Sequence, residues 1–220
     1  MPHQREYSLT ALVVIESLQL FIIAPLAEMS HLAFALVTVV MVANIAAAVA
    51  VVWHIRAAVL AVLLATLLEV AATVLRFVRP SAATDALDLA AALILIGALT
   101  VVLGMAVFGP GRVTVHRILG AVVIYLNVAI AFALAYRLVD AAGSGTFVAA
   151  GNPPHQSIAA LIYFSFTTIT TTGYGDIVPV DAFARSLSNV EGIVGQLFPT
   201  TLLARLITLE IHARQSESAP

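Results

Sequence analysis

The chain contains the segment Thr171-Thr172-Gly173-Tyr174-Gly175-Asp176, from which the rest of the architecture can be inferred. Its two glycines stand at alternate positions, and glycine takes left-handed backbone dihedrals without a Cβ clash. A backbone that alternates between right- and left-handed dihedrals turns successive carbonyls toward one axis. The spacing therefore predicts a row of backbone oxygen atoms. The competing interpretation is an ordinary loop with a Gly-Tyr-Gly turn.

The segment 170–176 resembles the pore loop of potassium channels, whose motif is Thr-x-Val-Gly-Tyr-Gly or a close variant. In that family, carbonyl rings from four identical loops replace the hydration shell of K⁺. The resemblance implies a selectivity filter at residues 171–176, with the Thr171 hydroxyl closing the innermost site. Thr172 stands where Val or Ile is commoner, but its carbonyl faces the ion, so we expect selectivity to survive. The K⁺ ions would bind the carbonyls of Thr171, Thr172, Gly173 and Tyr174.

The composition is that of a membrane protein. Hydrophobic residues make up 61% of the chain and charged residues 10%, with a mean hydropathy of +1.05. These values exceed those of soluble globular proteins and indicate a polytopic helical protein in lipid. All ten basic residues are arginine and the formal net charge is -2, so nucleic acid is not an expected partner. The chain has no cysteine, which excludes disulfides and thiolate metal sites.

Four apolar runs in residues 1–110 predict a peripheral domain of four spans. The runs lie at 8–26, 31–53, 57–78 and 85–108. The first has a rival interpretation as a signal peptide, which Glu16 within the run disfavours. The fourth has no basic residue, so it is not a voltage-sensing helix. The roles of Glu16 and of Glu69 in the third span stay open, with hydrogen-bonded structural roles favoured over proton sensing.

Residues 111–220 predict the pore domain, which begins after Gly109-Pro110-Gly111. A fifth span at 113–139 leads to Asn152-Pro153-Pro154, a typical helix start that predicts a short pore helix at 153–168. The last span follows at 182–211. The predicted fold is thus all-α, with six spans, a re-entrant pore helix and a filter loop.

Several residues are candidates for supporting the filter from behind. Tyr163 and Phe164 occupy pore-helix positions where many family members have a cuff of aromatic residues, and plain core packing is the alternative. Thr167 stands where some relatives have an acid. We expect Glu191, about two turns into the last span, to replace that acid by accepting a hydrogen bond from Thr167 or Thr168. The alternative is an ion pair with an arginine such as Arg137.

One face of the last span is predicted to line the central cavity. The spacing of three and four residues places the candidates on a shared face, and they are Gln196, Thr200, Leu203 and Ile207. A hinge is predicted at Gly192, Gly195 and Pro199, although the glycines also suit close helix packing. Arg205 nears the inner mouth and needs to turn outward or pair with an acid such as Glu210.

The resemblance also implies topology and assembly. The family's pore loop enters from outside, which places both termini in the cytoplasm of a multi-pass plasma (inner) membrane protein. One filter copy per chain requires four chains, hence a homotetramer. The expected function is passive, K⁺-selective conduction, with no enzyme activity and no cofactor besides the permeant K⁺. Alternatives are a weakly selective monovalent cation channel, a transporter subunit, or a membrane sensor with a vestigial pore. The sequence does not identify the gating stimulus.

Overall fold

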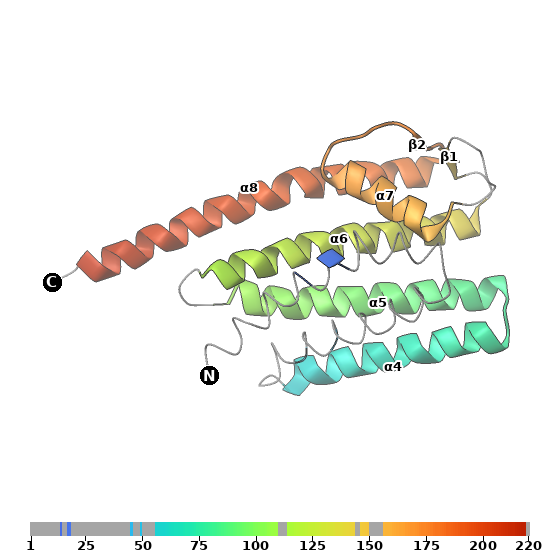
Figure 1. The fold of residues 1–220 in the computed structure, drawn as a ribbon, viewed down its shortest axis with the longest axis horizontal. Helices are drawn as coiled ribbons and strands as arrows, with labels where there is room; N and C mark the ends of the chain where they lie inside the picture. The colour runs from blue at the N-terminus through green and yellow to red at the C-terminus, as the bar shows by residue number, and fades with distance from the viewer. Residues whose placement is uncertain are drawn as a thin grey trace. The chain divides into compact units, whose positions relative to one another are not determined.

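The computed structural model describes residues 56–109, 114–143, 146–149 and 156–218, with a few isolated positions before residue 50. The predicted first and second spans, and with them Glu16, lie outside the described residues. The remaining chain is mostly helical (Figure 1). Its helices are α4 (Arg56–Val78), α5 (Ala82–Val107), α6 (Val115–Ala142), α7 (Ile158–Ile169) and α8 (Ala182–Ser218).

Three of these helices are long and apolar enough to cross a membrane, namely Arg56–Val78, Ala82–Val107 and Arg117–Ala142. The sequence predicted helices at 57–78, 85–108 and 113–139, so these are confirmed to within a few residues. The segment α8 begins at the predicted Ala182 but continues to Ser218, beyond the predicted end at 211. It is more polar than the other three helices. The chain is thus a membrane protein built mainly of helices.

Two short strands correct the all-α prediction. The strand β1 (Phe147–Ala149) pairs antiparallel with β2 (Ile177–Pro179), and Val148 faces Val178 in the register. The β-branched residues Val148, Ile177 and Val178 suit an extended backbone. Backbone hydrogen bonding in these loops is satisfied between segments far apart in the sequence, which local sequence patterns do not reveal.

The chain forms two compact units. One comprises Leu60–Ala98 and Leu126–Leu197 and is called the α7 unit below. The other comprises Met1–Val59, Leu99–Tyr125 and Phe198–Pro220. The α7 unit contains the predicted filter, both strands and the turn between α4 and α5.

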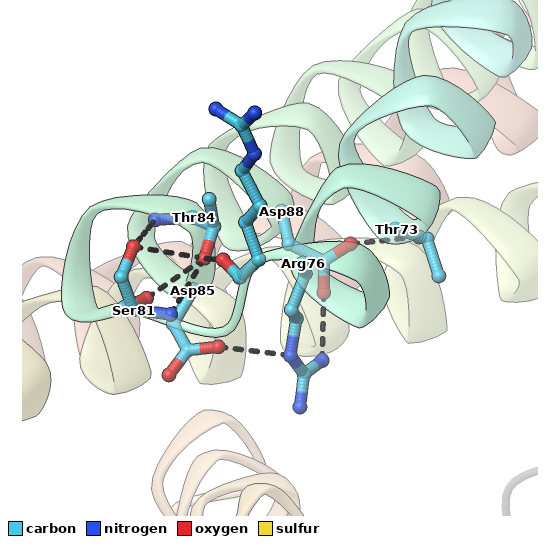
Figure 2. A network of polar contacts seen from close by, with 7 residues as sticks. Thr73, Arg76, Ser81, Thr84, Asp85 and Asp88 are labelled. Atoms are coloured by element: carbon cyan, nitrogen blue, oxygen red, sulfur yellow. Dashed lines mark hydrogen bonds and ion pairs between the residues drawn. The ribbon is translucent and has the colours of Figure 1, made fainter.

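The turn between α4 and α5 is tied by a polar network (Figure 2). The Arg76 guanidinium lies 2.9 Å from the Asp85 carboxylate and donates to Asp88 at 2.8 Å. Asp88 is buried and also accepts from the Thr73 hydroxyl at 2.7 Å. Ser81 and Thr84 exchange hydrogen bonds between side chain and backbone, in the manner of a capping box, and so start α5.

An aromatic core holds the α7 unit together. It consists of Tyr136 on α6, Phe147 on β1, Phe164 and Leu161 on α7, and Ala184 on α8. The Tyr136 ring meets Phe164 edge-on with centroids 5.1 Å apart, and Phe147 with centroids 5.6 Å apart. Such arrangements add to the stabilisation from buried area. The core therefore fixes α7 against the outer helix α6 and the start of α8.

Candidate functional site

The short helix α7 begins at Ile158, five residues later than predicted. Ser157 is its N-cap, and the Ser157 hydroxyl accepts a hydrogen bond from the Ala160 amide at 3.1 Å. The backbone amide of the preceding residue, Gln156, donates to the buried Asp140 carboxylate on α6 at 2.9 Å. The prediction of a start at Pro153 was wrong because these two contacts hold Gln156 and Ser157 outside the helix. Asn152, Pro153 and Pro154 lie outside the described residues.

The backbone after α7 alternates in handedness. Gly173 has φ +55° and Gly175 has φ +78°, so the left-handed dihedrals expected at both glycines are present. Thr171 is also left-handed at φ 58°, which is a strained conformation for a β-branched residue. Left-handed residues thus occupy positions 171, 173 and 175.

Two backbone hydrogen bonds tether this stretch to the end of α7. The Thr171 amide donates to the Thr168 carbonyl at 2.9 Å, and the Gly173 amide donates to the Thr167 carbonyl at 3.0 Å. The carbonyls at the C-terminus of α7 are thus used to hold the loop. Because these two backbone amides bond to α7, the start of the loop is fixed to the end of that helix.

The loop is exposed along its length on a single chain. All residues from Thr170 to Asp176 are exposed, and the Tyr174 side chain is 71% exposed. A Cβ built on Gly173 or Gly175 would meet no atom within 4 Å. The Thr172 hydroxyl contacts the Thr170 hydroxyl at 2.9 Å, so it has a partner in its own chain.

Tyr163 and Phe164 lie in different environments. The Tyr163 hydroxyl donates to Asp176 at 2.8 Å, and its ring stacks on Tyr174 with centroids 6.3 Å apart and planes 3° apart. Phe164 instead belongs to the buried aromatic core with Tyr136. Tyr163 therefore contacts the predicted filter directly, whereas Phe164 anchors the helix behind it.

Contacts after the loop fix the beginning of α8. The strand β2 follows the filter, and the Val180 amide donates to the Thr146 carbonyl at 2.9 Å. One Asp181 carboxylate oxygen accepts from the amides of Phe183 and Ala184 at 2.8 and 3.1 Å, which caps the helix. The predicted filter is thus held at both ends, by α7 on one side and by β2 with the Asp181 cap on the other.

Glu191 is fully buried, but the partners predicted for it were wrong. Its carboxyl oxygens contact the Tyr136 hydroxyl at 2.6 Å and the Ser165 hydroxyl. The hydroxyls of Thr167 and Thr168 both donate to the Phe164 carbonyl, at 2.9 and 2.8 Å, within their own helix.

The alternative partner proposed for Glu191 is wrong as well. Arg137 lies 3.8 Å from Asp140 and pairs with that residue. A role for Glu191 behind the filter stays a prediction, with a new set of contacts.

The predicted cavity face of α8 approaches the filter at Gln196, whose side-chain amide donates to the Thr171 hydroxyl at 3.3 Å. Thr200 is exposed on the same helix. The side chains of Leu203 and Ile207 lie outside the described residues. Cavity lining stays a prediction for all four positions.

The predicted hinge residues differ in their surroundings. A Cβ built on Gly195 would overlap the backbone carbonyl of Ile169 at the end of α7, so this glycine permits a close helix approach. A Cβ on Gly192 would meet nothing within 4 Å. Pro199 lies within α8. The packing interpretation thus gains support at Gly195, and a hinge stays a prediction.

Arg205 belongs to the other compact unit and binds the end of α5. Its guanidinium donates to the Phe108 carbonyl at 2.7 Å and lies 5.0 Å from the centre of the Phe108 ring. Arg117 similarly donates to the Gly109 carbonyl at 2.8 Å. The expected alternative of an Arg205 pair with Glu210 involves a side chain outside the described residues.

Sequence reasoning missed Tyr136, Ser165 and Asp140. Asp140 could have been suspected, because an acid near the end of an apolar helix needs a partner. Ser165 and Tyr136 gave no such signal, since serine and tyrosine are common in membrane helices.

Comparisons with known proteins find a similarity between part of the chain and ion channels. Residues 114–211 match the family described as "Ion channel". Protein LctB of Bacillus caldotenax is 25% identical over 120 residues, which cover 53% of this chain and 89% of that protein. No solved structure matches the chain. The similarity to ion channels thus lies in residues 114–211, which contain α6, α7, the predicted filter and most of α8.

Proposed function

We propose that this protein is a K⁺-selective channel in which four copies of the chain bring the filter Thr171–Asp176 around one axis. The observation that carries the proposal is the alternation of left-handed residues at 171, 173 and 175. This alternation lets consecutive carbonyls face one side, and rings of carbonyls select K⁺ by replacing its water shell.

The exposure of the filter on one chain supports assembly. Tyr174 is 71% exposed, and neither filter glycine has a neighbour within 4 Å of a built Cβ. A single loop supplies only one side of an ion site, so identical chains must supply the others. Cyclic homo-oligomers are a common solution in soluble proteins, and four loops match the potassium-channel filter. The protein would lie in the plasma (inner) membrane with both termini in the cytoplasm.

A weakly selective monovalent cation channel is the second candidate, and Thr172 is the observation that favours it. Its hydroxyl contacts the Thr170 hydroxyl at 2.9 Å, where a valine would make an apolar contact. A polar contact that admits water beside the filter would loosen the carbonyl cage. In that case the protein would conduct Na⁺ as well as K⁺.

Purified protein in liposomes tests the proposal. We expect K⁺ efflux down its gradient when a proton carrier balances the charge, and much slower flux with Na⁺ in place of K⁺. Native mass spectrometry of the same sample should give a tetramer. Equal K⁺ and Na⁺ fluxes would favour the second candidate, and a monomeric protein without flux would contradict both.

A further inference from the structure

We propose that Glu191 is buried as a neutral carboxylic acid whose proton bonds the inner helix α8 to the pore helix α7, and that it is a positioning residue for the filter. The effect of Glu191 on the filter rests on the proposed channel function, whereas its protonation state is argued from its contacts alone. It concerns five residues of the α7 unit that lie behind the filter, on α6, α7 and α8.

The two oxygens of Glu191 have different partners. Oε2 accepts a hydrogen bond from the Tyr136 hydroxyl on α6 at 2.6 Å, and Oε1 contacts Ser165 Oγ on α7. Ser165 Oγ also lies 2.7 Å from the backbone carbonyl of Ala129 on α6. Ser188 Oγ lies 3.4 Å from the Tyr136 hydroxyl. Glu191, Tyr136 and Ser165 are all 0% exposed, so no water replaces these contacts.

Counting protons decides the state of the carboxyl group. A serine hydroxyl has one proton to donate, and a backbone carbonyl only accepts. The contact between Ser165 and Ala129 therefore uses the serine proton. The contact between Ser165 Oγ and Glu191 Oε1 then needs a proton from the carboxyl group.

A neutral acid satisfies the whole chain of contacts. Tyr136 donates to Glu191, Glu191 donates to Ser165, and Ser165 donates to the Ala129 carbonyl. With an ionised carboxylate, the Ser165 hydroxyl would lie against two acceptors, the Ala129 carbonyl and Glu191 Oε1, but it has only one proton. One of these two buried contacts would then have no hydrogen between its oxygen atoms.

The charges around Glu191 agree with a neutral acid. Tyr136 is the titratable group that faces it from α6, and α7 has no charged residue. The neighbouring Arg137 lies 3.8 Å from Asp140 instead. None of the ion pairs in the described part of the chain involves Glu191. An ionised carboxylate at this place would be a buried charge without a counter-ion, which proteins avoid.

The position of this bond gives it a consequence for the filter. Ser165 lies on α7 two residues before Thr167, whose carbonyl holds the Gly173 amide. Glu191 lies one turn before Gly195, where α8 meets the carbonyl of Ile169. The acid therefore fixes the rotation and depth of α7 between α6 and α8. Losing its proton donation would loosen the helix that orients the filter carbonyls.

Infrared difference spectra between the wild-type protein and Glu191→Gln test the chemistry directly. At neutral pH we expect the variant to lose a carbonyl stretching band of a protonated acid and to keep all carboxylate bands. Ser165→Ala should shift this acid band, because the acceptor of its proton is removed. Thr167→Ala is the matched control, since the Thr167 hydroxyl donates to Phe164 and not to Glu191. Loss of a carboxylate band in Glu191→Gln would overturn the proposal.

Flux measurements test the positioning role. A glutamine amide donates and accepts as a neutral acid does, so Glu191→Gln should keep K⁺ flux within about twofold of wild type. Glu191→Val removes both functions and should lose about tenfold or more. Equal loss in both variants, with tetramers intact, would contradict a neutral acid. The infrared experiment does not depend on conduction. A lack of K⁺ selectivity would therefore refute the proposed function without contradicting a neutral Glu191.

Discussion

Three alternate left-handed residues are the most specific feature at the residue scale. Two are glycines, for which this conformation is cheap, and the third is Thr171 at φ 58°. A β-branched residue held left-handed stores strain that the surrounding hydrogen bonds must offset. Two hydrogen bonds supply part of that restraint. One runs from the Thr171 backbone amide to the Thr168 carbonyl, and the other runs from the Gln196 side chain to the Thr171 hydroxyl.

Gly173→Ala and Gly175→Ala should each abolish K⁺-selective flux. The cause is conformational, because a built Cβ at either position meets no atom within 4 Å, whereas a left-handed dihedral costs an alanine about 1–2 kcal/mol. Gly97→Ala in α5 is the matched control, since Gly97 has equally open space and no left-handed dihedral, and it should conduct normally. K⁺ over Na⁺ selectivity that survives in both filter variants would remove the basis of the filter assignment.

Prediction from sequence succeeded at this scale where backbone conformation decides, and failed where side-chain direction decides. The glycine spacing predicted two left-handed dihedrals that the structure has. The depth of Glu191 predicted a buried, hydrogen-bonded acid, but its partners are Tyr136 and Ser165 rather than Thr167 or Thr168. Which hydroxyl of α7 faces Glu191 depends on the rotation of that helix about its axis, and tertiary packing sets this rotation.

At the scale of elements, α8 packs closely against the end of α7. Gly195 stands against the Ile169 backbone, and Gln196 next to it reaches the Thr171 hydroxyl. One turn earlier, Glu191 contacts Ser165 on the same helix α7. The inner helix therefore supports the pore helix at two successive turns.

Gly195→Ala and Gly192→Ala should separate close packing from a hinge. The added methyl group at Gly195 meets backbone atoms that cannot rotate away, and overpacking of this kind costs about 1–3 kcal/mol. We expect Gly195→Ala to lower the thermal stability of the assembly and the K⁺ flux. Gly192→Ala has open space and should be as stable as wild type. Reduced opening of a fully stable Gly192→Ala protein would indicate instead that Gly192 is a hinge.

Element boundaries show what the sequence does and does not determine. The helix α5 begins at Ala82 after Ser81, where a local capping arrangement with Thr84 is present. The pore helix begins later than Asn152-Pro153-Pro154 suggested, because Asp140 on a different helix binds the Gln156 amide. The strands β1 and β2 pair across 27 intervening residues (150–176), so their hydrogen bonds are invisible to local patterns.

At the scale of the whole molecule, neither of the two described helices before residue 110 has a regularly spaced series of basic residues. The helix α5 (Ala82–Val107) contains no arginine or lysine. Arg76, near the end of α4, is fixed by Asp85 and Asp88 rather than arranged in a regular series of cations. The polar network at this turn ties α4 to α5 and holds the Arg76 guanidinium in ion pairs.

Membrane voltage should therefore have little intrinsic effect on opening. One elementary charge that crosses 100 mV gains only about 2.3 kcal/mol, so steep gating needs several charges per subunit. Planar-bilayer recordings of open probability from negative to positive voltages should show a shallow slope. Arg76→Gln should leave that slope unchanged while lowering the stability of the hairpin. A gating charge of many elementary units per assembly would contradict this view of α5.

K⁺ selectivity is measured by the reversal potential with K⁺ on one side of the membrane and Na⁺ on the other. The proposed filter of four Thr171–Asp176 loops predicts a reversal potential displaced far toward the K⁺ equilibrium value, and loss of this displacement in Gly173→Ala but not in Gly97→Ala. A reversal potential near zero in the wild-type protein would contradict K⁺ selectivity.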